Sequence, residues 1–124
     1  MTNRNVVLVV DDDPGILMSV KRLLRANGYE SLLFSTARAF MEQVDFENAC
    51  CILLDINLED GSGIELSYDL TAAGSSVPVI FMTGNDNPAV RKAALEAGCV
   101  AYLTKPFSAK SLIDSVERAW AGVM

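Results

Sequence analysis

The stretch VVLVVDDDPGIL, Val6 to Leu17, places three carboxylates directly after five apolar residues. The continuous apolar run predicts a strand that is covered on both faces, as in a parallel sheet. An Asp before Pro14 is typical of a helix start, because Asp caps the first turn and Pro suits its first position. That interpretation explains one of the three acids easily. The others would repel one another and lose hydration at the end of a buried strand unless a cation lies beside them.

Short apolar runs alternate with helical patterns along the rest of the chain. Strands are predicted at 6–10, 31–34, 50–54, 77–82 and 99–103, and helices around 16–24, 37–39, 64–73, 93–97 and 112–120. Five β-α repeats predict a single doubly wound α/β domain with a five-stranded parallel sheet and helices on both faces. We expect this domain to span residues 1–124, with its core at 5–121 and no output domain.

Composition and charge exclude several classes of protein. Ten basic and sixteen acidic residues give a net charge of −6, which argues against direct nucleic-acid binding. No apolar run approaches the roughly 20 residues of a membrane span, and the N-terminus lacks a signal peptide's apolar core. We therefore expect a cytoplasmic protein without membrane contact. Cys50, Cys51 and Cys99 lack metal-ligand spacing and are predicted to be core residues.

Chemically useful side chains follow four of the five predicted strands. Asp11 and Asp12 follow the first, Asp55 the third, Thr83 the fourth and Lys105 the fifth. In the flavodoxin-like (βα)5 order, 2-1-3-4-5, the first and third strands flank the switch point where ligands bind, which would bring the three acids together. Carboxylates are ligands that Mg²⁺ prefers, and a bound cation would offset their repulsion. A carboxylate can also act as a nucleophile and form an aspartyl phosphate.

Four segments carry a resemblance to a known family. They are LVVDDDP (8–14), ILLDINLEDGSG (52–63), IFMTG (80–84) and YLTKPF (102–107). Together, and in this order, they resemble the receiver domain of bacterial two-component response regulators. The resemblance extends from Val6 to Trp120, which is nearly the whole chain.

The resemblance implies a phosphoryl and metal site at these strand ends. Asp55 would be the phosphoacceptor. Asp11, Asp12, Asp55 and the backbone carbonyl of Asn57 would bind Mg²⁺, with Mn²⁺ as an alternative cation. Asp13 then belongs to the helix start, so that the three acids divide into two metal ligands and one cap.

The resemblance also assigns residues that would sense the phosphoryl group. Thr83 and Lys105 would contact it, and Tyr102 would be the aromatic switch residue that follows Thr83. A cis Lys105-Pro106 bond would allow Lys105 to point inward. Asn57 and Asn85, each two places after a site residue, would tune the rate at which the phosphoryl group is lost.

The function that the resemblance implies is a phosphorylation-controlled switch rather than an enzyme, although the domain assists its own phosphorylation and dephosphorylation. The donor would be a phosphohistidine on a sensor histidine kinase or a histidine phosphotransfer protein. The chain has no histidine of its own, which fits an external donor. The surface of the fourth helix, fifth strand and fifth helix would control an output domain or partner protein, or form a homodimer on phosphorylation.

Two other interpretations remain open. Asp11-x-Asp13 resembles the nucleophile motif of haloacid-dehalogenase-type phosphatases, but such an enzyme would need a cap insertion and a late acidic pair, where this chain offers Asp86 alone. A pseudo-receiver would bind partners without phosphorylation, yet those proteins tend to lose an acid or the lysine. The family often has Pro near Glu59, and here an extra acid takes its place. Gly63 keeps the expected offset from the phosphoacceptor.

Overall fold

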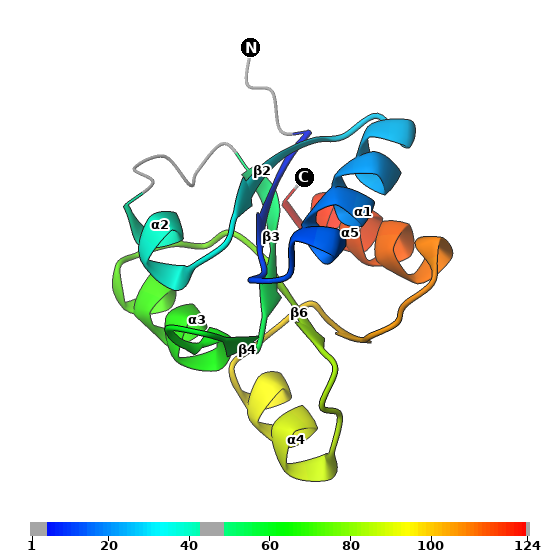
Figure 1. Cartoon of the computed structure of the whole chain (residues 1–124). Coiled ribbons are helices and arrows are strands. Elements are labelled where there is room, and N and C mark those ends of the chain that lie inside the picture. The colour runs from blue at the N-terminus through cyan, green and yellow to red at the C-terminus, as the bar shows by residue number, and fades with distance from the viewer. Residues whose placement is uncertain (1–4, 43–48, 124) are drawn as a thin grey trace.

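The computed structural model describes residues 5–42 and 49–123, and its long strands form one parallel sheet (Figure 1). Across this sheet the strand order is β2-β1-β3-β6-β7, while β4 and β5 pair separately as a short antiparallel ribbon. Without the ribbon, the order is the predicted 2-1-3-4-5, so the predicted flavodoxin-like fold is confirmed. Positions 1–4, 43–48 and 124 of the predicted domain lie outside the described residues.

The strands lie close to their predicted positions. Their bounds are β1 (Val6–Val10), β2 (Glu30–Phe34), β3 (Ala49–Asp55), β4 (Asn57–Leu58), β5 (Gly61–Ser62), β6 (Val79–Thr83) and β7 (Ala101–Thr104). The predictions 77–82 and 99–103 each began too early. Pro78 has no N–H to give to a ladder, so β6 starts after it. Gly98, whose φ is 84°, ends the preceding helix, and two further residues lead into β7.

Polar side chains cap the first turns of the helices, although the helix predicted around 93–97 begins earlier, at Pro88. The helices are α1 (Pro14–Ala26), α2 (Ala37–Met41), α3 (Gly63–Ala72), α4 (Pro88–Glu96) and α5 (Ala109–Val123). Asp13 accepts the Gly15 N–H at the start of α1, with Pro14 in the first turn, so its predicted role as a cap is confirmed. In the part of the chain that the structure describes, no helix is both long and apolar enough to cross a membrane.

Two apolar layers cover the sheet. On one face, buried residues of α1 and α5, such as Leu24 and Val116, pack against Val7, Val9 and Leu53. On the other face, buried residues from α2, α3 and α4 pack against alternate strand positions. Figure 1 shows α1 and α5 to the right of the sheet, with α2 and α3 to the left. This two-sided cover explains why β3 is buried along its whole length.

The cysteine prediction is correct for two residues and wrong for the third. Cys50 and Cys51 are fully buried in β3. Cys99 is only half-buried, because it lies in the connection between α4 and β7 and packs against the edge of the core. The β4-β5 ribbon was not predicted either, because paired strands of two residues are too short to make a recognisable pattern.

Candidate functional site

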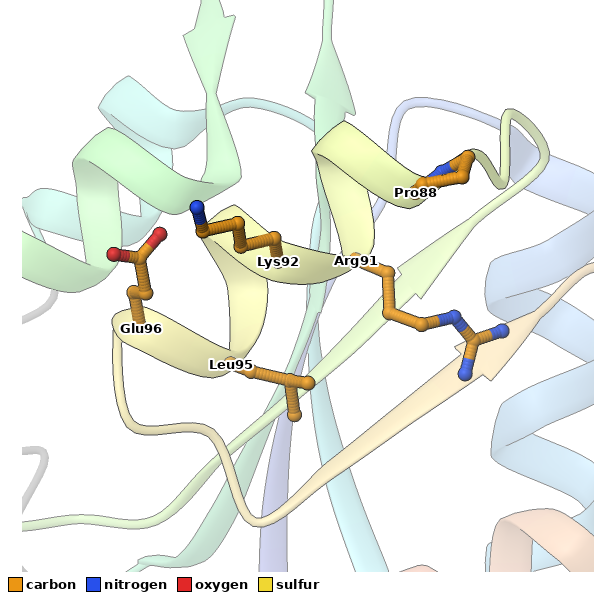
Figure 2. A pocket seen from close by; sticks show the side chains of 5 residues that line it. All are labelled: Pro88, Arg91, Lys92, Leu95 and Glu96. Atoms are coloured by element: carbon orange, nitrogen blue, oxygen red, sulfur yellow. The ribbon is translucent and has the colours of Figure 1, made fainter.

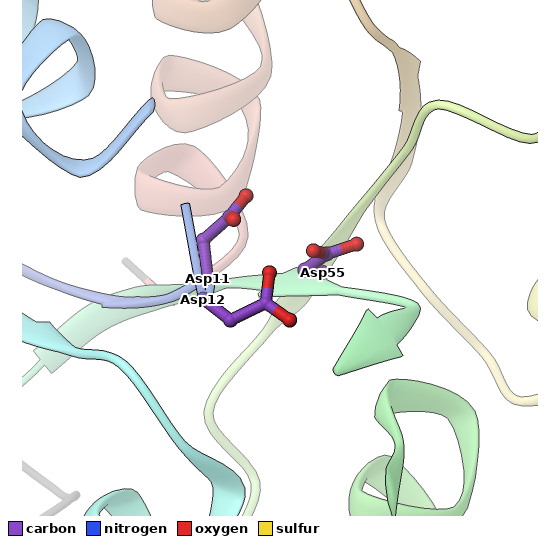
Figure 3. A group of neighbouring side chains, drawn as sticks. All are labelled: Asp11, Asp12 and Asp55. Atoms are coloured by element: carbon purple, nitrogen blue, oxygen red, sulfur yellow. The ribbon is translucent and has the colours of Figure 1, made fainter. Parts of the chain in front are cut away.

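The carboxylates of Asp11, Asp12 and Asp55 meet at the carboxyl ends of β1 and β3, as predicted (Figure 3). One oxygen atom from each lies within 4.8 Å of the others. β1 and β3 are neighbouring strands in which Val10 pairs with Leu54, so the acids that follow these residues are held side by side. Asp11 is 0% exposed and Asp55 4% exposed, whereas Asp12 is half-buried. Carboxylates this close and this buried require compensating positive charge.

Lys105 supplies part of that charge. Its Nζ atom lies 2.7 Å from Asp11 Oδ2 and 3.2 Å from Asp55 Oδ2. The Lys105-Pro106 peptide bond is cis, as predicted. Burial lowers the pKa of Lys105, but its hydrogen bonds and charge interactions with Asp11 and Asp55 outweigh burial, so the pKa lies above its usual value. The lysine therefore stays protonated. It follows β7, and its contacts join that strand's end to the ends of β1 and β3.

Asp55 has the surroundings of a reactive carboxylate. Its Oδ1 accepts the Asn57 N–H at 3.0 Å, and its Oδ2 accepts from Lys105. Burial raises the pKa of Asp55 and the charge of Asp11 raises it further, while the Asn57 N–H and Lys105 lower it, and the net effect is a raised pKa. Each oxygen of the Asp55 carboxylate is thus held by one donor, a backbone N–H or an ammonium group.

Asn57 connects Asp55 to Thr83. The Thr83 hydroxyl donates to Asn57 Oδ1 at 3.3 Å and accepts the Asn85 N–H at 3.0 Å. Thr83 ends β6, which pairs with β3, and it is fully buried. The predicted phosphoryl-sensing threonine therefore lies beside the predicted phosphoacceptor, with its hydroxyl bonded to the loop that follows Asp55.

Gly63 leaves room for this loop to turn back on itself. Its N–H donates to the Ile56 carbonyl at 2.9 Å, and a Cβ atom at this position would lie 2.2 Å from the Asp55 carbonyl oxygen. Any side chain at residue 63 would therefore push directly on the backbone of Asp55. The offset between Asp55 and Gly63, noted from the sequence, has a steric cause.

An open hollow of about 300 Å³ gives access to the site, lined by Asp55, Asn57, Gly84, Asn85 and Lys105. A larger hollow of about 440 Å³ runs along α4, lined by Pro88, Arg91, Lys92, Leu95 and Glu96 (Figure 2). The smaller hollow contains the predicted phosphoacceptor and its lysine, and the larger one contains none of the clustered acids. The smaller hollow is therefore the candidate site for phosphoryl chemistry.

Two groups of contacts near the site, one around Asp86 and one around Asp60, were not predicted from the sequence. The Tyr102 hydroxyl donates to Asp86 Oδ1 at 3.0 Å, and Arg91 donates to Asp86 Oδ2 at 2.9 Å. Asp60, in the loop after Asp55, accepts the N–H groups of residues 37 and 38 and so caps α2. The extra acid noted at Glu59, next to Asp60, was a weak feature of the sequence that could have pointed to this cap. Nothing in the sequence pairs Tyr102 with Asp86, because they lie on different elements.

The acid cluster fits a hard divalent cation. Three carboxylates share a small space in which the Lys105 contacts reach only Asp11 and Asp55. An all-oxygen donor set suits Mg²⁺ or Mn²⁺. Asp11, Asp12 and Asp55 would hold the ion, and the participation of the Asn57 backbone carbonyl stays a prediction.

Comparison with known proteins assigns the family. Residues 7–117 match the response regulator receiver domain. The chain belongs to this family. Among curated proteins, this receiver domain is 30% identical over 115 residues to the response regulator protein TmoT of Ectopseudomonas mendocina, covering 93% of the chain and 52% of TmoT. It spans about half the length of the curated relatives it matches first.

Solved receiver domains share its fold. A CheY-like response regulator receiver domain protein from Methanospirillum hungatei is 29% identical, with a TM-score of 0.87 and coverage of 96% of this chain and 95% of that one. The beryllofluoride-activated NtrC4 receiver domain dimer is 26% identical, with a TM-score of 0.88 and coverage of 97% and 99%. The likeness therefore extends over essentially the whole domain.

Replacing Gly63 tests the steric account of the loop. Gly63→Ala should lower the free energy of unfolding by about 2 kcal/mol or more, because the new methyl group overlaps the Asp55 carbonyl. Gly122→Ala is the matched control, since a Cβ there meets nothing within 4 Å and Ala favours helix. Urea denaturation measures both. Equal stability of Gly63→Ala and the unsubstituted domain would contradict the account.

Replacing Asp12 tests the repulsion in the cluster. Asp12→Ala should raise the metal-free stability by about 1 kcal/mol, because a carboxylate close to two others is removed. It should also weaken Mg²⁺ binding and so reduce the stability that the ion would add by binding only the folded state. Thermal melts with EDTA and with Mg²⁺ measure both effects. A lower melting temperature for the metal-free variant would show that the acids do not repel one another in the way proposed.

Proposed function

We propose that this receiver domain is a phosphorylation-controlled switch in which Asp55 accepts a phosphoryl group from a phosphohistidine on a sensor histidine kinase or histidine phosphotransfer protein. The reaction depends on Mg²⁺. The observation that carries the proposal is the position of Asp55. It is the one acid of the cluster that both contacts Lys105 and lines the open hollow, within the described residues.

The other acids of the cluster suit ligand roles better than the nucleophilic role. Asp11 is fully buried, with one oxygen bonded to Lys105 and the other to the Asp13 N–H. Asp12 does not line the hollow beside Lys105. The burial of Asp11 argues against a phosphatase that uses it as nucleophile. The intact acids and lysine favour a phosphorylated receiver over a pseudo-receiver.

The transfer itself needs little from the protein beyond position and charge. An Asp55 carboxylate oxygen forms a bond to phosphorus while the phosphorus–nitrogen bond of the donor breaks, and its electron pair stays on the imidazole nitrogen. Lys105 neutralises negative charge on the phosphoryl oxygens. A bound Mg²⁺ would supply further positive charge there. The Thr83 hydroxyl breaks its hydrogen bond to Asn57 and donates a hydrogen bond to the phosphoryl group instead.

The domain acts as a switch rather than as an enzyme with a released product. Its output surface is formed by α4, β7 and α5, which correspond to the fourth helix, fifth strand and fifth helix of the sequence prediction. Movement of Thr83 toward the phosphoryl group is followed by movement of Tyr102, which alters this surface. The α4 hollow of Figure 2, with exposed Leu95 beside charged residues, belongs to it.

The partners follow from the family and from the surface. An output domain or partner protein binds the α4-β7-α5 surface, and a homodimer forms there on phosphorylation. The dimer of the beryllofluoride-activated NtrC4 receiver supports dimerisation as one outcome. The chain covers only 52% of TmoT, which supports a further domain in that relative. The net charge of −6 argues against nucleic-acid binding by the receiver itself. Three free cysteines fit a reducing compartment, and we place the switch in the cytoplasm.

Asp55→Asn should abolish phosphorylation by acetyl phosphate, because an amide is not a nucleophile of this kind. Intact-mass spectrometry should show a single, acid-labile, Mg²⁺-dependent phosphoryl adduct on the unsubstituted domain and none on Asp55→Asn. Asp69→Asn, which changes an exposed acid on α3, is the matched control and should be phosphorylated normally.

Location of the adduct separates the alternatives. Borohydride reduction converts an aspartyl phosphate to homoserine, which tandem mass spectrometry assigns to a residue. Homoserine at position 55 supports the proposal. Homoserine at position 11 would indicate the phosphatase-type nucleophile, and no adduct on the unsubstituted domain would indicate a pseudo-receiver. Either of the last two results would overturn the proposed function.

A further inference from the structure

Three side chains at the edge of the output surface contact one another in a closed triangle. Tyr102 of β7 donates its hydroxyl to Asp86 Oδ1 at 3.0 Å, and Arg91 of α4 donates to Asp86 Oδ2 at 2.9 Å. The Arg91 guanidinium carbon also lies 4.7 Å from the centre of the Tyr102 ring. Figure 2 shows the Arg91 side chain extending away from α4, whereas Lys92 and Glu96 point elsewhere. Each of the three groups therefore contacts both of the others.

The geometry gives these contacts more weight than an ordinary surface ion pair. The side chains of Arg91 and Asp86 are 52% and 37% exposed, and an isolated ion pair with this exposure contributes little to stability. Here one guanidinium both donates to the carboxylate and lies over the ring in a cation–π contact. Both carboxylate oxygens are used, one by each partner. The hydrogen bonds from Arg91 and Tyr102 lower the pKa of Asp86, which keeps it charged.

The triangle is joined to the phosphoryl-sensing threonine by the chain itself. Asp86 directly follows Asn85, whose N–H donates to the Thr83 hydroxyl at 3.0 Å. A Thr83 hydroxyl that turns toward Asp55 changes its bond to Asn85 and so changes the backbone that carries Asp86. Tyr102 lies on β7, where it pairs with Phe81 of β6, two residues before Thr83. Thr83 and Tyr102 are thus linked through Asp86 as well as through the sheet.

We propose that Asp86 and Arg91 are positioning residues that hold the Tyr102 hydroxyl at the outer edge of β7 and so favour the resting form of the switch. The inference rests on the proposed function, in which Tyr102 moves inward when Asp55 is phosphorylated. A contact that exists in one form and is lost in the other shifts the equilibrium toward the first. The phosphorylated form must therefore break the Tyr102–Asp86 bond, and this sets how readily the domain switches.

A double-mutant cycle with a phosphate mimic tests this inference. The unsubstituted domain, Asp86→Ala, Tyr102→Phe and the double variant are titrated with beryllofluoride in excess Mg²⁺, and the half-conversion concentration is read from backbone amide NMR signals. The metal-free spectra establish that each variant is folded. Arg91→Ala is a second way to break the triangle. Arg22→Ala removes an exposed charge on α1, outside the α4-β7-α5 surface, and is its matched control.

Asp86→Ala should lower the half-conversion concentration about three- to tenfold, because a hydrogen bond that favours the resting form is lost. Arg91→Ala should act in the same direction, and Arg22→Ala should have no effect. In the Tyr102→Phe background, Asp86→Ala should change the concentration by less than about twofold, since the hydroxyl through which it acts is gone.

The outcomes distinguish the inference from the function on which it rests. A normal response of the unsubstituted domain together with an unchanged or higher concentration for Asp86→Ala would overturn the role of Asp86 alone. An equally large effect of Asp86→Ala with and without the Tyr102 hydroxyl would also overturn it, because Asp86 would then act by another route. Failure of the unsubstituted domain to respond would overturn the proposed function and this inference with it.

Discussion

The Lys105 ammonium group between Asp11 and Asp55 is the interaction on which the site depends. It joins the ends of β1 and β3 through contacts of 2.7 and 3.2 Å, and it comes from the loop after β7 at the far edge of the sheet. Two buried carboxylates would otherwise be strongly unfavourable. A single ammonium cannot neutralise three carboxylates, so the cluster retains an attraction for a cation. The same excess of negative charge that makes the metal-free site unfavourable would favour the binding of Mg²⁺.

The loop after Asp55 contacts several elements of the domain. The Asn57 N–H binds Asp55 while its side chain accepts from Thr83. Two residues of the same short loop start helices, since Ser62 caps α3 and Asp60 caps α2. Gly63 keeps the turn close to the Asp55 backbone. In the proposed switch, a change at Asp55 would therefore act on Thr83, α2 and α3 through the contacts of this one loop.

Patterns that depend on burial were readable from the sequence, whereas side-chain partners across elements were not. Val6 to Val10 predicted a central strand because both faces of the sheet are covered, and the position of Asp11, Asp55 and Lys105 followed from parallel strands ending at one edge. Boundaries were less accurate at β7, where a glycine-ended helix leads into the strand. The Tyr102–Asp86 contact spans sixteen residues and depends on side-chain orientation, which no periodicity encodes. The phosphoryl and metal roles of the site residues remain predictions.

A crystal structure of the domain with Mn²⁺ and beryllofluoride would test the central claim most directly. Anomalous scattering locates the manganese without reference to the protein structure. The account predicts one anomalous peak among the carboxylates of Asp11, Asp12 and Asp55, with beryllium bonded to an Asp55 oxygen and its fluorides in contact with Lys105 and Thr83. A manganese peak away from this cluster, or beryllium bonded to another residue while Asp55 is unmodified, would contradict the account.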